Sequence, residues 1–289
     1  MNTRTGHFPI GFRRGWSDWQ KNLPSLIQWA KDNGLSAIDI GHDADKIGRQ
    51  ILDAGLRIGT ADLKEWHGMI SPSKATRAKA VKANIADIEK NATLGPINYF
   101  LVMLPEKPEL PRAENFGYMV ESFAQIAPAL EAAKARIVIE GWPGPGALCC
   151  TPEGYRAFFK AVPSKAMGVN YDPSHLLRMG IDPIRFLNEF VGRVYHVHGK
   201  DTELNAENLY NYGHEQPPTF AKPVDFGNMA WRYTIPGHGQ VSWNEVFRIL
   251  QANKYKGAVC IELEDANFNG TVEGEKQGIL LGAQYLAGV

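Results

Sequence analysis

The chain carries no excess of charge of either sign, because its 289 residues include 31 Lys and Arg and 31 Asp and Glu. Without a net charge there is no overall field to attract a nucleic-acid backbone or an anionic membrane surface. The sequence also has no apolar run close to the roughly 20 residues of a membrane-spanning helix, and its first residues show no apolar signal segment. We therefore expect neither a nucleic-acid partner nor a membrane partner.

Cysteine is scarce and poorly placed for disulfides. The three cysteines are the adjacent Cys149 and Cys150, and Cys260 inside an apolar run. They cannot form the disulfide framework of a small secreted protein, so we expect a cytoplasmic location.

No Gly-x-Gly-x-x-Gly turn follows the first predicted strand, so a dinucleotide-binding open sheet has no support either.

Apolar strand-like runs alternate with segments of helical periodicity along the whole chain. Strands are expected at residues 8–12, 37–41, 57–63, 99–104, 136–140, 167–171, 194–197 and 258–263, and helices at about 23–33, 44–54, 72–92, 115–134, 152–161, 183–190, 243–252 and 274–286. Strict alternation predicts a parallel sheet. Eight strand–helix units at this length predict an α/β fold with one domain, residues 1–289, closed as a single (β/α)8 TIM barrel.

Residues 202–235 interrupt this alternation with a long segment that has no clear period and many aromatic residues. Loops of this length are uncommon in compact domains and are often lids or binding loops. We expect a long insertion after the seventh strand that covers the C-terminal mouth of its own barrel or a partner's, with Trp231 or Tyr212 near the pocket. The alternative is a decoration that packs on the barrel rim or on a neighbouring subunit.

Four residues that can bind a metal stand at the C-terminal ends of the last four predicted strands: Glu140, Asp172, His198 and Glu262. In a (β/α)8 barrel the chemistry lies at the C-terminal ends of the strands, so these side chains are expected to converge. Carboxylate and imidazole ligands suit one divalent metal ion, namely Mn²⁺, Mg²⁺, Co²⁺ or Zn²⁺, and no cysteine is placed to join them.

Motifs in the second half resemble those of the xylose isomerase-like TIM barrels, which include the sugar phosphate isomerases/epimerases and AP endonuclease family 2. The matching segments are Asp172-Pro173-Ser174-His175, the His-x-His-x-Lys-Asp run at 196–201, Pro236-Gly237-His238-Gly239, and the carboxylate-rich residues 262–265. The resemblance is dense from Glu140 to the C-terminus. Over the first half it rests on the strand–helix alternation alone.

The resemblance implies a metal held by Glu140, Asp172, His198 and Glu262, with Glu140 and Glu262 also acting as an acid/base pair on opposite sides of the substrate. Burial is expected to raise the pKa of these carboxyls and so make them better bases. His175 would hydrogen-bond a substrate oxygen or a ligand, although it could instead be satisfied by the backbone.

Two further acidic or basic residues leave alternatives open. Lys200 would neutralise an oxyanion or a phosphate, although a salt bridge with Asp201 is its alternative. Glu264 faces the same way as Glu262 and would replace it if the strand register differed.

The expected function is a divalent-metal-dependent isomerase or epimerase of a keto-sugar or sugar phosphate, which removes a proton next to a carbonyl through a metal-stabilised enediolate. The alternative is a metal-dependent dehydratase or lyase acting on a cyclic polyol ketone or a keto-glycoside. A barrel that only binds a sugar would not need Glu140 or Glu262 as a base. The small molecule would be the partner, and the chain could form homo-oligomers.

A DNA-repair endonuclease of the AP endonuclease type is less favoured. Its cluster of zinc ions would need additional histidines after strands three and four. The fourth predicted strand is instead followed by Pro105 and Glu106.

Overall fold

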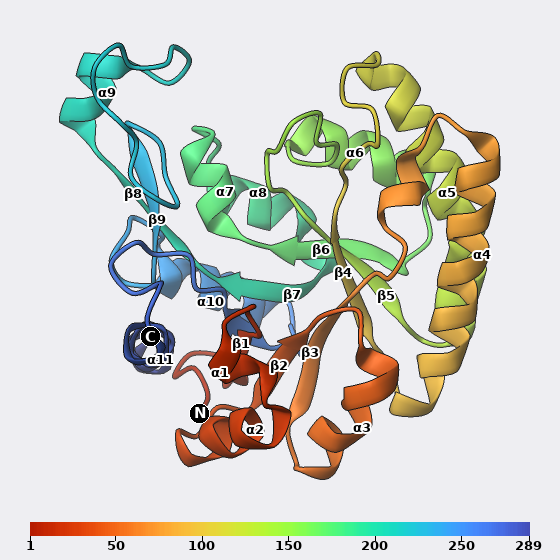
Figure 1. Cartoon of the computed structure of the whole chain (residues 1–289), viewed down its shortest axis with the longest axis horizontal. Helices are drawn as coiled ribbons and strands as arrows, with labels where there is room; N and C mark the ends of the chain where they lie inside the picture. The colour runs from red at the N-terminus through yellow and green to blue at the C-terminus, as the bar shows by residue number, and fades with distance from the viewer. The chain divides into compact units, whose positions relative to one another are not determined.

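In the computed structural model, which describes residues 1–289, eight parallel strands form a closed barrel (Figure 1). Their order around the barrel is β1, β10, β7, β6, β5, β4, β3, β2. The barrel strands are β1 (Ile10–Arg13), β2 (Ala37–Ile40), β3 (Arg57–Asp62), β4 (Asn98–Val102), β5 (Arg136–Glu140), β6 (Met167–Tyr171), β7 (Val194–Gly199) and β10 (Val259–Ile261). The predicted α/β TIM barrel is therefore confirmed.

Helices follow the strands along the chain. The α-helices are α1 (Asp18–Lys21), α2 (Leu23–Asp32), α3 (Ala44–Asp53), α4 (Lys74–Asn91), α5 (Arg112–Ala132), α6 (Pro152–Ala161), α7 (Pro173–Arg178), α8 (Pro183–Phe190), α9 (Ala206–Tyr212), α10 (Trp243–Ala252) and α11 (Val272–Gly288). Short 3-10 helices are η1 (His67–Ile70), η2 (Ala92–Leu94) and η3 (Val191–Arg193). Each predicted helix and strand lies within a few residues of its expected place. No helix has the length and apolar character that a membrane span requires.

Local sequence signals account for several of these boundaries. Thr151 accepts a hydrogen bond from the Gly154 amide at the start of α6, as expected of an N-cap, and Pro152 occupies the first turn. Gly34 and Gly55 follow α2 and α3 with φ of +71° and +83°, a conformation that costs glycine little. Strand interiors such as Ile137–Ile139 are fully buried, as expected for strands covered on both faces.

The chain packs as two compact units. The first consists of Met1–Ala37, Asp172–Glu189 and Val197–Val289, and contains β1, β10, the end of β7 and helices α10 and α11. The second consists of Ile38–Tyr171 and Phe190–His196, and contains β3 to β6, where β5 pairs in parallel with β4 and with β6. The single-domain expectation stays a prediction.

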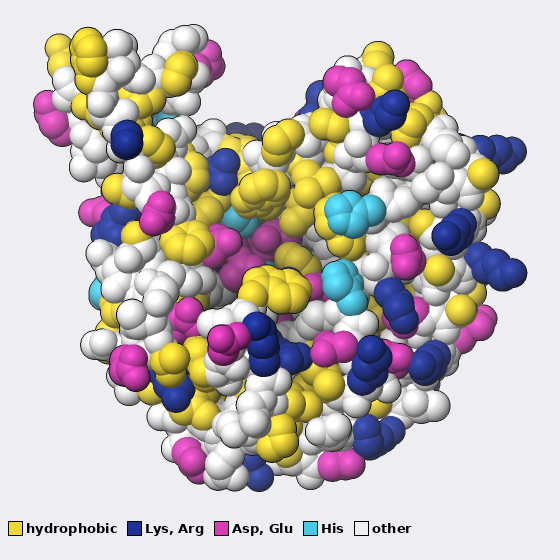
Figure 2. All heavy atoms as spheres, viewed as in Figure 1, with side chains coloured by type: hydrophobic (Ala, Val, Ile, Leu, Met, Phe, Trp, Pro, Cys, Tyr) yellow, Lys and Arg dark blue, Asp and Glu magenta, His cyan; other side chains and the backbone are white.

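The segment after β7 contains regular structure that the sequence pattern did not predict. β8 (Asp201–Leu204) pairs antiparallel with β9 (Trp231–Thr234), and α9 lies at the outer end of this hairpin (Figure 1). We call residues 201–234 the hairpin arm. Hydrophobic side chains lie on its surface (Figure 2), including Tyr210 and Phe220, whose exposed fractions are 86% and 97%. The lid role of this segment remains a prediction.

Candidate active site

Asp172 has two structural roles at the junction between β6 and α7. Its Oδ1 accepts hydrogen bonds from the Ser174 amide at 2.9 Å and from the Ser174 hydroxyl at 2.6 Å, and thereby caps α7. Its Oδ2 points the other way, 3.2 Å from Lys200 Nζ and 3.8 Å from His198 Nδ1. The cap therefore fixes the carboxylate so that one oxygen is directed at the neighbouring basic groups.

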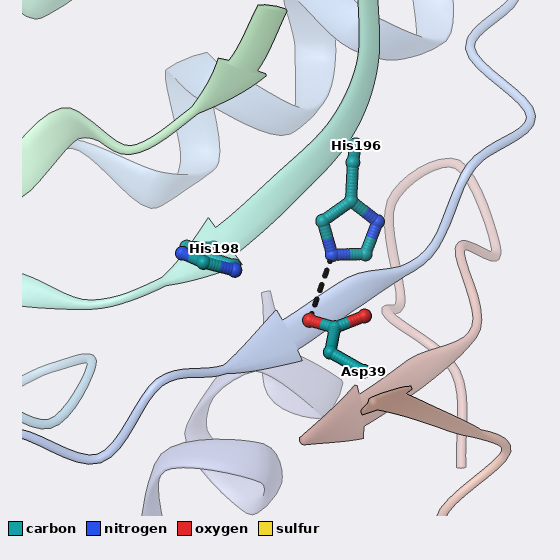
Figure 3. A group of neighbouring side chains, drawn as sticks. All are labelled: Asp39, His196 and His198. Carbon is teal, nitrogen blue, oxygen red and sulfur yellow. Dashed lines mark hydrogen bonds and ion pairs between the residues drawn. The ribbon is translucent and has the colours of Figure 1, made fainter. Parts of the chain in front are cut away.

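The two histidines of β7 have different partners. His196 Nε2 lies 3.0 Å from Oδ2 of Asp39, and both side chains are fully buried (Figure 3). His198 Nδ1 lies 3.2 Å from Oε2 of Glu262. His196 therefore has a carboxylate partner, and its omission from the predicted ligand set stays a prediction. Asp39 was missed, although an acidic residue inside the apolar strand Ala37–Ile40 was a signal that could have found it.

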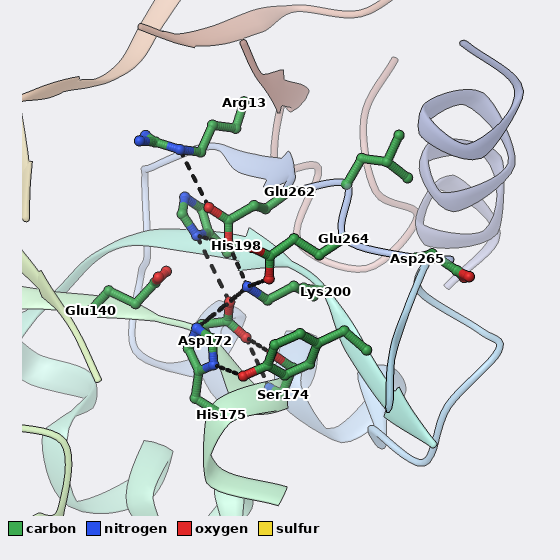
Figure 4. A network of polar contacts seen from close by, with 12 residues as sticks. Arg13, Glu140, Asp172, Ser174, His175, His198, Lys200, Glu262, Glu264 and Asp265 are labelled. Atoms are coloured by element: carbon green, nitrogen blue, oxygen red, sulfur yellow. Dashed lines mark hydrogen bonds and ion pairs between the residues drawn. The ribbon is translucent and has the colours of Figure 1, made fainter. Parts of the chain in front are cut away.

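Glu262 follows the last residue of β10 and contacts three basic groups (Figure 4). These are His198, Lys200 at 2.5 Å and Arg13 at 3.3 Å. Glu264, the alternative considered from the strand register, contacts Lys200 at 2.9 Å. Both carboxylates contact Lys200, and Glu262 also contacts His198. The choice of Glu262 over Glu264 as a ligand stays a prediction.

Lys200 is the centre of the acidic cluster. Its side chain is 1% exposed, and its ammonium group contacts Asp172, Glu262 and Glu264 and lies 3.4 Å from His175 Nε2. The alternative pairing with Asp201 is wrong. Asp201 points away and accepts hydrogen bonds from the Thr202, Val241 and Gly237 amides and from the Trp243 indole.

Tyr233 brings the hairpin arm into the same cluster. Its hydroxyl accepts a hydrogen bond from Arg178 and lies 2.6 Å from Nδ1 of His175. The opposite ring nitrogen of His175, Nε2, lies 3.4 Å from Asp172 Oδ2 and 3.4 Å from Lys200 Nζ, so the imidazole connects Tyr233 to the acidic cluster. Burial raises the pKa of Tyr233, so the phenol stays neutral.

The sequence interpretation placed Trp231 or Tyr212 of the arm near the pocket, and this stays a prediction. Trp231 packs on Tyr233 at a ring distance of 4.9 Å and beneath Arg178, and Tyr212 lies on α9. Alternation along β9 places residues 231 and 233 on one face. Tyr233, which was not singled out from the sequence, is the arm residue that contacts His175.

Glu140 ends β5 in the second unit and is buried. Its Oε2 accepts a hydrogen bond of 2.7 Å from Asn170, which is its register partner on β6. Asn170 was not singled out from the sequence because a lone asparagine in a strand carries no specific signal. Its amide orients the Glu140 carboxylate, as partners of metal-binding carboxylates commonly do.

The donor set fits a divalent metal ion. Asp172, His198 and Glu262 each offer one ligand atom, and these atoms lie within 4.8 Å of one another. Two carboxylates and an imidazole in a buried site match the ligand preferences of Mg²⁺, Mn²⁺, Co²⁺ and Zn²⁺. Buried acidic and histidine side chains in this cluster could therefore hold a metal.

The charge environment of Glu262 corrects one expectation. Burial by itself would raise the pKa of this carboxyl, but His198, Lys200 and Arg13 outweigh burial and hold its pKa well below the usual range. The expected raised pKa is therefore wrong for Glu262. The carboxyl stays ionised, as a metal ligand must be, and is a weaker base than its burial alone suggested.

The family model described as "Xylose isomerase-like TIM barrel" matches residues 25–287. The Bacillus subtilis uncharacterized protein YfiH is 36% identical over 121 residues, which cover 39% of this chain and 38% of that protein. Inosose dehydratase of Clostridium tetani is 34% identical over 94 residues, which cover 32% of this chain and 29% of the relative. The matched regions thus span about a third of the length of these relatives.

Solved structures share the fold over nearly the whole chain. The 3-keto-D-glucoside 4-epimerase YcjR from E. coli superposes with a TM-score of 0.67 at 14% identity, covering 96% of this chain and 98% of that one. The IOLI protein, solved with a bound zinc atom, superposes with a TM-score of 0.68 at 16% identity, with coverage of 96% and 98%. At these identities the likeness concerns the fold.

Proposed function

Because this chain belongs to the xylose isomerase-like TIM barrel family, we propose that it is a divalent-metal-dependent isomerase or epimerase of a small keto-sugar. The observation that carries the proposal is the buried cluster of Asp172, His198 and Glu262 around Lys200. The proposed reaction is removal of a proton next to the substrate carbonyl and its return to a carbon of the same enediolate.

Glu140, Asp172, His198 and Glu262 would hold the metal ion. When bound, the ion would supply a positive charge that stabilises the negative charge formed on the substrate oxygens. The place of Glu140 in this set is supported by chain connectivity. Its register partner Asn170 stands two residues before Asp172 along the chain, so β5 and β6 end at neighbouring positions.

The protein's own groups would move the proton and hold the substrate. We propose that one of Glu140 and Glu262 accepts the proton and the other returns it. His175 is held by Tyr233, and its Nε2 would hydrogen-bond a substrate oxygen. Lys200 would neutralise charge on the same oxygens, because its ammonium group is already among the carboxylates. The low pKa of Glu262 makes it a weaker base than its burial alone suggests.

Glu140→Gln and Glu262→Gln test the acid/base pair. Glutamine keeps the shape and one oxygen ligand but cannot accept the proton, so each variant should lose at least about a thousandfold in kcat, the scale of general acid–base catalysis. In deuterated water the wild type should incorporate deuterium next to the carbonyl of a keto-sugar, and neither variant should. Metal content must be measured on the same samples. Full activity in a variant with bound metal would remove that carboxylate from proton transfer.

Dehydration is the second candidate function, and two observations favour it. Inosose dehydratase is among the relatives that match part of the chain, and Lys200 and His175 place proton donors beside the carboxylates. In that reaction the base removes the proton next to the carbonyl, and an acid protonates the hydroxyl of the following carbon, which leaves as water. Mass spectrometry of the products decides between the two: an epimer has the mass of the substrate, and a dehydrated product is lighter by one water.

We propose a cytoplasmic location as well. Cys149, Cys150 and Cys260 are all buried free thiols, and a reducing compartment preserves that state.

A further inference from the structure

A hollow of about 320 Å³ opens beside Glu262, within the first unit. Its walls come from the turn after β1, the loop after β10 and α11, and Glu262 and Glu264 form part of one wall. The other members of the cluster, Asp172, His198 and Lys200, are not among its lining residues. Since ligand pockets begin at roughly 300 Å³, the hollow is a ligand-sized space that shares Glu262 and Glu264 with the proposed reaction centre.

Trp16 gives this hollow a flat apolar surface. It follows the Arg13–Gly15 turn at the end of β1 and is 82% exposed, although tryptophan is among the residues that are highly buried on average. An indole ring offers a broad face for the C–H surface of a sugar ring. The exposed ring at the lip of the hollow therefore suits a cyclic ligand that stacks on it.

The charges that line the hollow disfavour an anionic ligand. Three carboxylates face it, from Glu262, Glu264 and Glu275. Its two guanidinium groups have partners in the protein, because Arg13 is paired with Glu262 at 3.3 Å and Arg14 donates to the Gln20 carbonyl at 3.0 Å. The carboxylates are committed as well, because Glu262 and Glu264 pair with Lys200 and Glu275 accepts hydrogen bonds from Ser17 and Trp19. A phosphate or carboxylate would find no uncommitted cation in the lining, whereas a neutral polyol would find donors and acceptors.

We propose that this hollow is a subsite for the neutral second ring of a glycoside, so that the substrate is a keto-glycoside and neither a free keto-monosaccharide nor a sugar phosphate. The proposal rests on the function proposed above. The ring with the carbonyl and its neighbouring hydroxyl would lie at the Asp172, His198 and Glu262 cluster. The second ring would extend past Glu262 and stack on Trp16. A keto-glycoside keeps the two adjacent oxygens that the chemistry needs while its ring stays closed.

The test compares three substrates with the manganese-loaded enzyme: a keto-glucose, its 6-phosphate, and a disaccharide with the same keto group on one ring. The wild type should favour the disaccharide over the other two by about tenfold or more in kcat/KM, the scale of an aromatic stacking contact. Trp16→Ala should remove most of this preference and leave kcat/KM for the monosaccharide unchanged, and Trp16→Phe should retain part of it. Tyr210→Ala is the matched control, because Tyr210 is equally exposed but lies on α9, outside the hollow.

Equal kcat/KM of the wild type on all three substrates, a preference for the phosphate, or an equal loss on every substrate in Trp16→Ala would overturn the subsite. Binding of the corresponding unoxidised disaccharide, followed by calorimetry, separates the subsite from the reaction. If no keto-sugar is turned over, the proposed function fails, and the binding assay still decides the subsite. The subsite is supported if Trp16→Ala weakens binding of this disaccharide about tenfold and Tyr210→Ala does not change it. The subsite is overturned if neither variant changes the binding.

Discussion

At the scale of single residues, the site depends on side chains that hold other side chains in place. Asp172 caps α7 with one oxygen and faces Lys200 with the other, and Tyr233 fixes the ring of His175. Asn170 has the same kind of role for Glu140. Such orienting contacts limit the motion of the reactive groups, and their loss commonly lowers metal affinity or activity by about 10- to 100-fold.

Asn170→Ala should weaken divalent-metal affinity by about 10- to 100-fold, because the Glu140 carboxylate loses the 2.7 Å hydrogen bond that orients it. Titration of the metal-free protein with Mn²⁺ by calorimetry measures the effect. Asn188→Ala is the control, since that side chain donates only to a backbone carbonyl on α8. Unchanged affinity in Asn170→Ala would argue against Glu140 as a ligand.

At the scale of elements, two sequence motifs that lie far apart form one structural joint. Both oxygens of Asp201, at the start of β8, accept hydrogen bonds, and their donors include the Gly237 and Val241 amides. A Cβ atom on Gly239 would lie 2.2 Å from Asp201 Oδ1 and 2.6 Å from the Thr202 amide. The glycines of the Pro-Gly-x-Gly motif therefore allow its backbone to approach Asp201. This contact between the motif and Asp201, which we call the joint, positions the hairpin arm.

Gly239→Ala should destabilise the fold by about 1–3 kcal/mol, since the added methyl group must displace the Asp201 carboxylate or the backbone beside it. Gly117→Ala, inside α5, has no atom within 4 Å of its new Cβ and should be neutral or stabilising by up to about 1 kcal/mol. Urea unfolding of the two variants measures the difference. Equal stability of both would show that the joint tolerates a side chain.

At the scale of the whole molecule, the proposed ligands come from sequence positions that span more than a hundred residues. Glu140 ends β5, Asp172 follows β6, His198 lies in β7 and Glu262 follows β10. A metal ion that binds the folded chain and not the unfolded chain must stabilise the fold. The site and the stability of the barrel are therefore expected to be linked.

Mn²⁺ at about one hundred times its dissociation constant should stabilise the wild type by about 2.7 kcal/mol. The corresponding rise in Tm is on the order of 5 °C for a protein of this size. Asp172→Asn, which removes one ligand charge, should show a much smaller rise when it is heated with the same metal concentration. A wild-type Tm that does not respond to any of the four candidate metals would contradict the metal site.

The sequence alone determined the barrel and the position of the candidate ligands along it. The hydrophobic period is a local property, so the strands and the helices could be recognised from neighbouring residues. The placement of Glu140, Asp172, His198 and Glu262 after successive strands followed from the same local pattern. Their assignment as ligands stays a prediction.

Only the tertiary structure decided which side chains pair across distance. Two of these contacts join residues that are far apart in the chain: Tyr233 with His175, and Asp39 with His196. The side chain of Asp201 could have pointed either way, and in the structure it points away from Lys200. The low pKa of Glu262 has the same origin, because it depends on three basic side chains, His198, Lys200 and Arg13, which come from separate segments. Such pairings are set by packing of the closed barrel, which no local pattern of residues encodes.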